Sequence, residues 1–170
     1  MSERDVHRIM DELPYGLYII GSQREGEANG MMADWLIQVS FRPRLVAVAF
    51  ENDARTLANV RESRAFTINL LPEDREGMAL AAHFAQPCDD AKIGGRLDRG
   101  ARRKLEGIPH GRTERGCPVL DGAMAWLECE AEQFVPTGDH TLVVARTVDG
   151  RLLRETAPLT STYTGWVYSG

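Results

Sequence analysis

The sequence predicts a mainly β protein, an antiparallel barrel with α-helices at its periphery. Segments with strand patterns outnumber segments with helix patterns, and they do not alternate with helices as a doubly wound parallel sheet requires. The clearest strand covers residues 124–135, where small or apolar residues alternate with glutamates. The chain of 170 residues is 43% hydrophobic and 26% charged, which suits one ordinary domain with its own core. We therefore expect a single domain over residues 1–170.

The first forty residues predict a helix followed by a β-hairpin. Pro14 ends a helix whose apolar residues recur at helical spacing, namely Val6, Ile9, Met10 and Leu13. Residues 15–22 have a strand pattern, and a second strand pattern covers residues 31–40. Asn29-Gly30 between them is a strong turn signal, so we expect the hairpin to turn there.

The middle of the chain predicts two strands, each followed by a helix. Residues 45–50 form an unbroken apolar run, which is typical of a strand that is covered on both faces at the centre of the core. Asp53 is the expected N-cap of a helix that reaches residue 63. Residues 65–71 form the next strand, and Pro72 fits the first turn of a helix that ends near residue 84. The packed side of that helix would carry Met78, Ala81, Ala82 and Ala85.

The last third of the chain predicts more strands after a long basic connection. Residues 86–115 hold eight of the twenty Lys and Arg residues, and connections this long are often functional covers or mobile segments. In the strand at 124–135 we expect the glutamates to face solvent. A strand over residues 141–148 would turn at Asp149-Gly150. Curling the sheet into a barrel would remove most exposed strand edges, and the edges that remain could be buried in a dimer.

The charge and the cysteines exclude several classes of function. Twenty Lys and Arg against twenty-five Asp and Glu give a net charge of −5, so nucleic acid and anionic membranes are not expected partners. The first apolar stretch is too short for a signal or membrane segment, and we expect a cytoplasmic protein. Three widely spaced cysteines, at 88, 117 and 129, suit neither a disulfide framework nor a zinc site. The four histidines are also scattered, so no metal site is predicted.

Several short segments together resemble one known family. Gly-rich phosphate loops, nucleophile elbows and His-Glu-x-x-His motifs are absent from the sequence. The segments are Asn29-Gly-Met-Met-Ala-Asp-Trp35, Gln38-Val-Ser40 with Pro43, Asn52-Asp-Ala-Arg-Thr56, Phe66-Thr-Ile-Asn-Leu70 and Gly138-Asp-His140. In this order they resemble the flavin reductase-like family of FMN-binding split β-barrels. The resemblance implies a homodimer with flavin near the subunit interface, and hydride transfer from NAD(P)H.

The resemblance also implies a set of site residues. His140 would lie close to the flavin and the incoming nicotinamide, as the candidate catalytic residue that stacks and positions rather than transfers a proton. The candidate cofactor-binding residues are Asn29, Met32, Ala33, Asp34, Trp35, Gln38, Val39, Ser40, Asn52, Arg55, Thr56 and Lys92.

Each of these assignments has a structural alternative. Trp35 and Met32 offer apolar area for a flavin ring, or they are core residues. Arg55 follows the start of a helix, where N–H groups and a cation suit a phosphate, unless it is simply solvated. His140 is either at the flavin or a turn histidine held by local backbone. Lys92 and the basic residues after it either close over a phosphate or form a solvated flap.

We therefore expect an FMN-binding oxidoreductase that passes electrons from NAD(P)H to free flavin, a metal chelate or a partner protein. FAD is the alternative flavin. One rival interpretation is a flavoredoxin-like electron carrier that does not oxidise NAD(P)H itself. Another is a noncatalytic barrel that binds haem or another small ligand.

Overall fold

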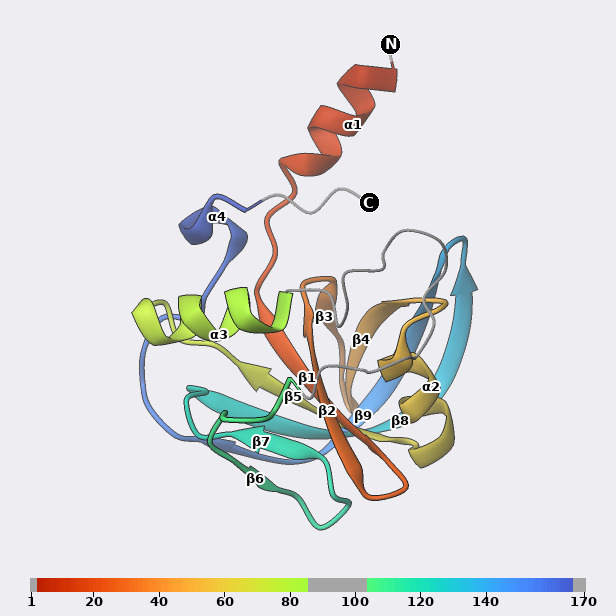
Figure 1. Cartoon of the computed structure of the whole chain (residues 1–170). Coiled ribbons are helices and arrows are strands. Elements are labelled where there is room, and N and C mark those ends of the chain that lie inside the picture. The colour runs from red at the N-terminus through yellow and green to blue at the C-terminus, as the bar shows by residue number, and fades with distance from the viewer. Residues whose placement is uncertain (1–2, 86–103, 167–170) are drawn as a thin grey trace.

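The computed structural model describes residues 3–85 and 104–166, which build a seven-stranded sheet surrounded by helices (Figure 1). The order along the sheet is β2-β1-β5-β8-β9-β4-β3, every neighbouring pair is antiparallel, and β6 and β7 form a separate ribbon. The strands are β1 (Tyr18–Arg24), β2 (Glu27–Ala33), β3 (Leu36–Phe41), β4 (Arg44–Glu51), β5 (Ala65–Leu70), β6 (His110–Arg112), β7 (Pro118–Leu120), β8 (Ala125–Thr137) and β9 (His140–Leu152). The helices are α1 (Glu3–Asp11), α2 (Arg55–Ser63), α3 (Arg75–Ala85) and α4 (Ser161–Thr164). The expected fold class is confirmed.

The two edge strands of the sheet, β2 and β3, are consecutive in the chain. Only Asp34 and Trp35 separate the end of β2 from the start of β3, so the sheet curls until its two edges meet at that point. Within the described residues no ladder joins β2 to β3. The barrel is therefore split, as the resemblance to FMN-binding split β-barrels implied, and in the part of the chain that the structure describes β2 and β3 keep their free edges.

Two apolar clusters hold the fold together, one on each face of β1. Ile20 packs inside the barrel with Phe66, Val143 and the α2 residues Leu57 and Val60. Ile19, the next residue, points to the opposite face, where α3 packs through Leu80, Ala81 and Phe84. Alternation along a strand explains this division, because successive side chains leave opposite faces. The expected buried strand at 45–50 is confirmed as β4, which contributes Val46, Val48 and Phe50 to the interior cluster.

The first hairpin forms as expected, but it turns at a different place. Glu25 and Gly26 both have positive φ, at 51° and 82°, and connect β1 to β2. Positive φ at both central residues is what a tight hairpin turn needs. Asn29 and Gly30 lie inside β2 instead, where a side chain on Gly30 would meet the Phe84 ring of α3. That glycine therefore reflects close packing and not a turn.

Two expected helix starts are wrong. Ala54 N–H donates a hydrogen bond to Glu51 O and closes a turn that contains Asp53. Asp53 therefore lies one residue before the helix cap, and the N-cap of α2 is Ala54. Pro72 does not enter α3 but makes an isolated bridge with Pro158. Backbone pairing with that C-terminal segment keeps the chain extended there.

The packed side of α3 is also different from the expected one. Its buried residues are Gly77, Leu80, Ala81 and Phe84, whereas Ala82 and Ala85 are exposed.

The β8–β9 hairpin is longer than expected. β9 runs through Asp149 and Gly150 without turning, and these residues pair with Glu128 and Leu127 of β8. A ladder irregularity lies between Glu128 and Cys129, and Glu128 is buried, which corrects the expectation that all these glutamates face solvent. The hairpin turns at Gly138 and Asp139, as expected from the glycine before the second strand, and Gly138 has φ of 78°.

The segments before β1 and after β9 are paired with each other. Gly16 bridges Thr160, Leu17 N–H donates to Leu159 O at 3.0 Å, and Ser161 N–H donates to Tyr15 O at 2.8 Å. The chain therefore enters and leaves the fold side by side. None of the helices within residues 3–85 and 104–166 is long and apolar enough to cross a membrane.

Candidate functional site

Trp35 and His140 lie against each other at the end of the barrel where its edges meet. Their ring centroids are 4.8 Å apart and the rings are inclined by 42°. Trp35 is 41% exposed, so one part of a large aromatic side chain remains at the surface. Trp35 O accepts a hydrogen bond from Ala49 N–H of β4, which fixes the backbone at this position. The structure therefore brings together two of the candidate site residues, one from each end of the sequence.

The carboxylate of Asp139 orients the imidazole of His140. His140 Nδ1 lies 2.7 Å from Asp139 Oδ1, and because a carboxylate only accepts hydrogen bonds, Nδ1 carries the proton. The hydrogen bond to His140 is the main cause that lowers the pKa of Asp139, whose side chain is exposed. Asp139 thus remains ionised and holds the ring against Trp35.

Asn52 joins this hairpin to the turn that precedes α2. Its backbone N–H donates to Asp139 O, its Nδ2 donates to Gly138 O at 3.0 Å, and its Oδ1 accepts from Thr141 Oγ1 at 2.8 Å. These bonds fasten the turn that carries His140 to the loop that carries Arg55. Asn52 contributes to the site by positioning other residues.

Asp34 places a buried carboxyl beside this pair. It is 8% exposed, and its Oδ2 is buried without a hydrogen-bond partner among the described residues. Burial raises the pKa of Asp34, the negative charge of Glu51 adds to the rise, and the backbone N–H of Trp35 and the nearby His140 oppose it. An orphaned buried oxygen of this kind is a place where a ligand can supply the missing hydrogen bond.

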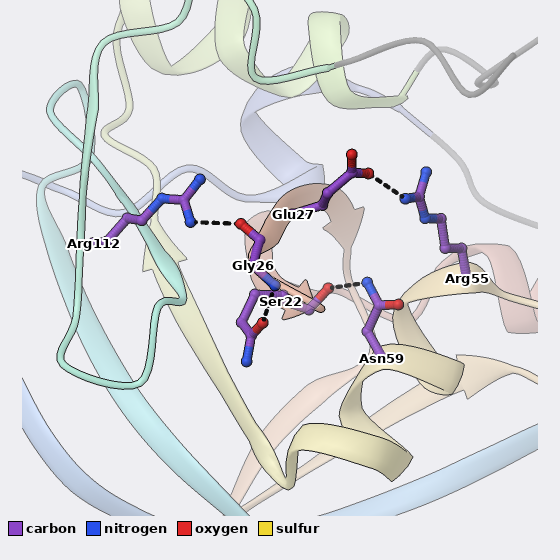
Figure 2. Close-up of polar contacts among 7 residues, drawn as sticks. Ser22, Gly26, Glu27, Arg55, Asn59 and Arg112 are labelled. Carbon is purple, nitrogen blue, oxygen red and sulfur yellow. Dashed lines mark hydrogen bonds and ion pairs between the residues drawn. The ribbon is translucent and has the colours of Figure 1, made fainter.

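The amino end of α2 holds the two residues expected to bind a phosphate, Arg55 and Thr56, and Asn29 contacts one of them. The N-cap Ala54 makes no side-chain hydrogen bond, so the first turn of the helix has no side-chain cap from that residue. Arg55 is the first residue of α2, and its Nη2 lies 3.5 Å from Glu27 Oε2 (Figure 2). Thr56 is buried, and its hydroxyl accepts a hydrogen bond from Asn29 Nδ2 at 3.1 Å. The cation is thus at the surface, whereas Thr56 and Asn29 join α2 to β2.

Gln38, Val39 and Ser40 lie further along β3, away from His140. They occupy an irregular part of the edge strand, where the ladder to β4 shifts between Gln38 and Ser40. Ser40 pairs with Leu45 of β4, whereas Trp35 lies beside Ala49, so these residues are several positions apart along the strand. The structure therefore does not bring them into contact with the Trp35–His140 pair.

The remaining candidates are divided between the core and the undescribed part of the chain. Ala33 is buried in the interior cluster, and Met32 packs on the α3 side with Ile19 and Phe84. Met32 fits its alternative as a core residue. Lys92 lies outside the described residues.

Sequence reasoning missed Glu27, Ile37 and Phe41. Glu27 contacts Arg55, and Ile37 and Phe41 are exposed on β3, at 63% and 82%. The recurrence of large apolar residues at 35, 37, 39 and 41 was the available signal, although the irregularity of β3 between Gln38 and Ser40 interrupts the alternation of faces. No signal in the sequence pointed to Glu27, since it depends on where the hairpin turns.

Other reactive groups do not form a site in the described ranges. Burial raises the pKa of both Cys117 and Cys129 to about 12, so neither is a thiolate near neutral pH. Within these ranges no group of three His, Cys, Asp or Glu side chains is arranged to hold a metal ion. A polar groove of about 480 Å³ lies elsewhere, beside the β6–β7 ribbon, and none of the candidate site residues lines it; its walls include Arg112, Arg115, Val119, Trp126, Glu128 and Asp149.

Comparison with known proteins covers nearly the whole described fold. The flavin reductase like domain matches residues 10–166. This match and the split antiparallel barrel define the class as flavoprotein oxidoreductases. The chain belongs to the flavin reductase-like family, as the resemblance in its sequence implied.

Individual relatives support the same family. The chain is 30% identical over 153 residues to diflavin flavoprotein A 1 of Synechocystis, covering 89% of this chain but 25% of that protein. The native flavin reductase PheA2 is 26% identical with a TM-score of 0.73, covering 94% of this chain and 93% of that one. The NADH:FAD oxidoreductase SgcE6 of Streptomyces globisporus has the same fold, with 22% identity, a TM-score of 0.76 and coverage of 94% and 89%. The chain spans about a quarter of the length of the diflavin flavoproteins it matches.

Proposed function

We propose that this protein binds FMN at the Trp35–His140 end of the barrel and accepts electrons from NAD(P)H. The observation that carries the proposal is the contact between the tilted rings of Trp35 and His140, which is joined through Asn52 to the turn before α2. A flavin mononucleotide needs an apolar surface for its ring, polar groups at the ring edge and a cationic seat for its phosphate. Trp35, Asp34 and Arg55 are one group of each of these kinds.

Specific residues fit each part of the ligand. The exposed part of Trp35 would contact the ring, and the orphaned Oδ2 of Asp34 would exchange a hydrogen bond with it. Arg55 and the first turn of α2 would hold the phosphate, because a guanidinium and helical N–H groups both favour an anion. FAD fits the same description at these residues.

His140 would position the nicotinamide. When bound, the flavin supplies the redox chemistry by accepting a hydride, so the protein need not transfer a proton in that step. His140 Nδ1 is held by Asp139, and its ring is held by Trp35, so the imidazole keeps one orientation. The proposed electron acceptor is free flavin, a metal chelate or a partner protein.

We also propose that the functional unit is a homodimer. β3 is an edge strand that exposes Ile37, Val39 and Phe41, and the exposed Trp35 directly precedes it. An edge strand with a row of exposed apolar side chains is typical of a surface that pairs with another chain. A second copy covering β3 would bury these side chains together with Gln38 and Ser40, which lie on the same strand.

The test begins with the apoprotein and added FMN. We expect uptake of FMN, seen as a shift in its visible absorption, followed by bleaching when NADH or NADPH is mixed in without oxygen. In His140→Ala we expect FMN to bind but to be reduced at least about tenfold more slowly, which corresponds to the loss of roughly 1.4 kcal/mol of positioning.

Three results would contradict the proposal in different ways. Binding without bleaching by either nucleotide would indicate the electron carrier. No uptake of FMN would indicate a barrel for another ligand, and a Soret band in the purified protein would identify haem. An unchanged rate in His140→Ala would leave that histidine a structural role.

A further inference from the structure

We propose that Glu27 competes with the flavin phosphate for Arg55, so that this carboxylate sets how strongly the site prefers a doubly charged phosphate. The inference rests on the proposed function, because it takes Arg55 to be the phosphate-binding cation. It assigns a role in ligand selection to Glu27, which lies outside the Trp35–His140 pair.

The contact that carries the inference is the ion pair between β2 and α2. Glu27 Oε2 lies 3.5 Å from Arg55 Nη2, and Figure 2 shows the two side chains pointing toward each other from the two elements. The side chains are 67% and 37% exposed, so water and ions reach both. The carboxylate therefore stands beside the cation that a phosphate would approach.

Hydrogen bonds on both sides of Glu27 keep its backbone beside α2. Arg112 Nη1 donates to Gly26 O at 2.9 Å, directly before Glu27. Two residues after Glu27, Asn29 Nδ2 donates to Thr56 Oγ1 at 3.1 Å. Deeper in the same contact, Asn59 Nδ2 donates to Ser22 Oγ at 3.1 Å in a buried position (Figure 2). The first turns of α2 and the hairpin thus form one rigid contact, with Glu27 and Arg55 at its outer side.

A bound phosphate at the amino end of α2 must share Arg55 with this carboxylate. A phosphate monoester carries a charge of about −1.5 to −2 at neutral pH, whereas each phosphate of a diphosphate diester carries one charge. Repulsion from Glu27 is therefore largest for FMN, smaller for FAD and absent for riboflavin. Because the groups are partly exposed, solvent and salt reduce the effect without removing it.

The experiment measures the dissociation constants of FMN, FAD and riboflavin for the apoprotein by quenching of flavin fluorescence. In Glu27→Gln we expect FMN to bind about two- to fivefold more tightly at low salt, which is the range of one exposed charge interaction. The gain should be smaller for FAD and absent for riboflavin, and it should shrink as salt is added.

Glu62→Gln is the matched control. Glu62 of α2 pairs with Arg24 of β1 at 2.9 Å, so it also joins the hairpin to this helix through an exposed ion pair. Its loss removes the same charge from the protein without touching Arg55. We expect no change in the affinity for FMN beyond about 1.5-fold, within the scatter of exposed pairs.

The double variant separates the inference from the proposed function. Arg55→Ala should weaken FMN by about three- to tenfold and leave riboflavin unchanged. When Glu27→Gln is added to Arg55→Ala, the affinity for FMN should rise much less than when Glu27→Gln is made in the wild type. The reason is that the cation shared by Glu27 and the phosphate is absent from the double variant. If Glu27→Gln binds FMN with the same affinity as the wild type while Arg55→Ala binds it more weakly, the role of Glu27 is overturned and the proposed phosphate site stands. An Arg55→Ala variant that binds FMN like the wild type overturns the phosphate seat as well.

Discussion

At the scale of single residues, the site combines groups whose charges depend on one another. Asp34 is buried beside His140 and Glu51, and burial is the main cause that raises its pKa. Asp139 is exposed, and its hydrogen bond to His140 lowers its pKa. The two carboxyl groups near one histidine are therefore pushed in opposite directions by their surroundings.

The raised pKa of Asp34 predicts a pH dependence of stability. Between the ordinary value of 3.8 and the higher pKa of the folded state, the folded protein binds more protons than the unfolded chain, so the free energy of unfolding falls as pH rises. In the apoprotein we expect Asp34→Asn to melt at a higher temperature than the wild type near pH 7. This advantage should vanish as pH falls toward 3.8.

Asp139→Asn is the control for this prediction. Its carboxyl is exposed and has a lowered pKa, so its removal should not raise the melting temperature near pH 7. A melting difference between wild type and Asp34→Asn that stays constant from pH 4 to pH 8 would show that the carboxyl of Asp34 does not titrate with folding.

Chemistry-bearing residues were predictable from the sequence to different extents. His140 follows a glycine that needs positive φ, and this local signal placed it correctly at a hairpin turn. The prediction of Asp53 as an N-cap was wrong by one residue. A turn between Glu51 and Ala54 precedes α2, and the sequence does not show at which residue such a turn ends. Met32 and Trp35 are three residues apart, yet the end of β2 lies between them and sends them to different surroundings. Periodicity along one strand cannot show where that strand stops.

At the scale of elements, a buried side-chain network attaches the β6–β7 ribbon to the main sheet. Asn69 of β5 donates through Nδ2 to Ile19 O at 3.0 Å, and its Oδ1 accepts from Leu120 N–H at 2.8 Å. Thr67, two residues earlier on the same face, donates to Pro118 O. These bonds join β1, β5 and β7 where no ladder connects the two sheets.

Asn69→Leu tests this attachment. The substitution keeps a similar volume but leaves Ile19 O and Leu120 N–H without their side-chain partner, and each buried unsatisfied group costs about 1–3 kcal/mol. We expect a loss of about 2–4 kcal/mol in the free energy of unfolding, measured by urea denaturation. If Asn69→Leu lowers the free energy of unfolding by less than about 0.5 kcal/mol, the ribbon is held to the sheet by apolar contacts and not by these hydrogen bonds.

Elements were predictable where their signal was local. The apolar run at 45–50 and the alternation at 124–135 both became strands because each pattern is complete within one segment. The end of β9 was missed because Asp149-Gly150 looks like a turn, yet a long partner strand continues the ladder through it. The bridge of Pro72 to Pro158 was missed for the same reason, since its partner is distant in the sequence.

At the scale of the whole molecule, the split in the barrel leaves one edge strand with an apolar surface. Ile37 is 63% exposed on β3, and Phe41 is 82% exposed at the end of the same strand. Such a surface is costly to leave in water, which is the basis for the proposed homodimer.

Ile37→Lys is expected to weaken that dimer. A lysine on β3 would place a charge within the proposed apolar contact, and charges on edge strands oppose pairing. We expect the wild type to have the mass of a dimer in light scattering, and Ile37→Lys to shift toward monomer with weaker retention of FMN.

Leu152→Lys is the comparison, since Leu152 is also exposed but ends β9 away from β3. A monomeric wild type, or an Ile37→Lys variant that stays dimeric like Leu152→Lys, would count against β3 as the interface.

The pairing of Tyr15–Leu17 with Leu159–Ser161 has a consequence for protein architecture. These two segments lead into and out of the barrel. Because they lie side by side, the chain enters and leaves the domain at the same place on its surface. A domain whose two ends lie together can be joined to a longer polypeptide with little effect on its interior, and about a quarter of the length of diflavin flavoprotein A 1 is similar to this chain.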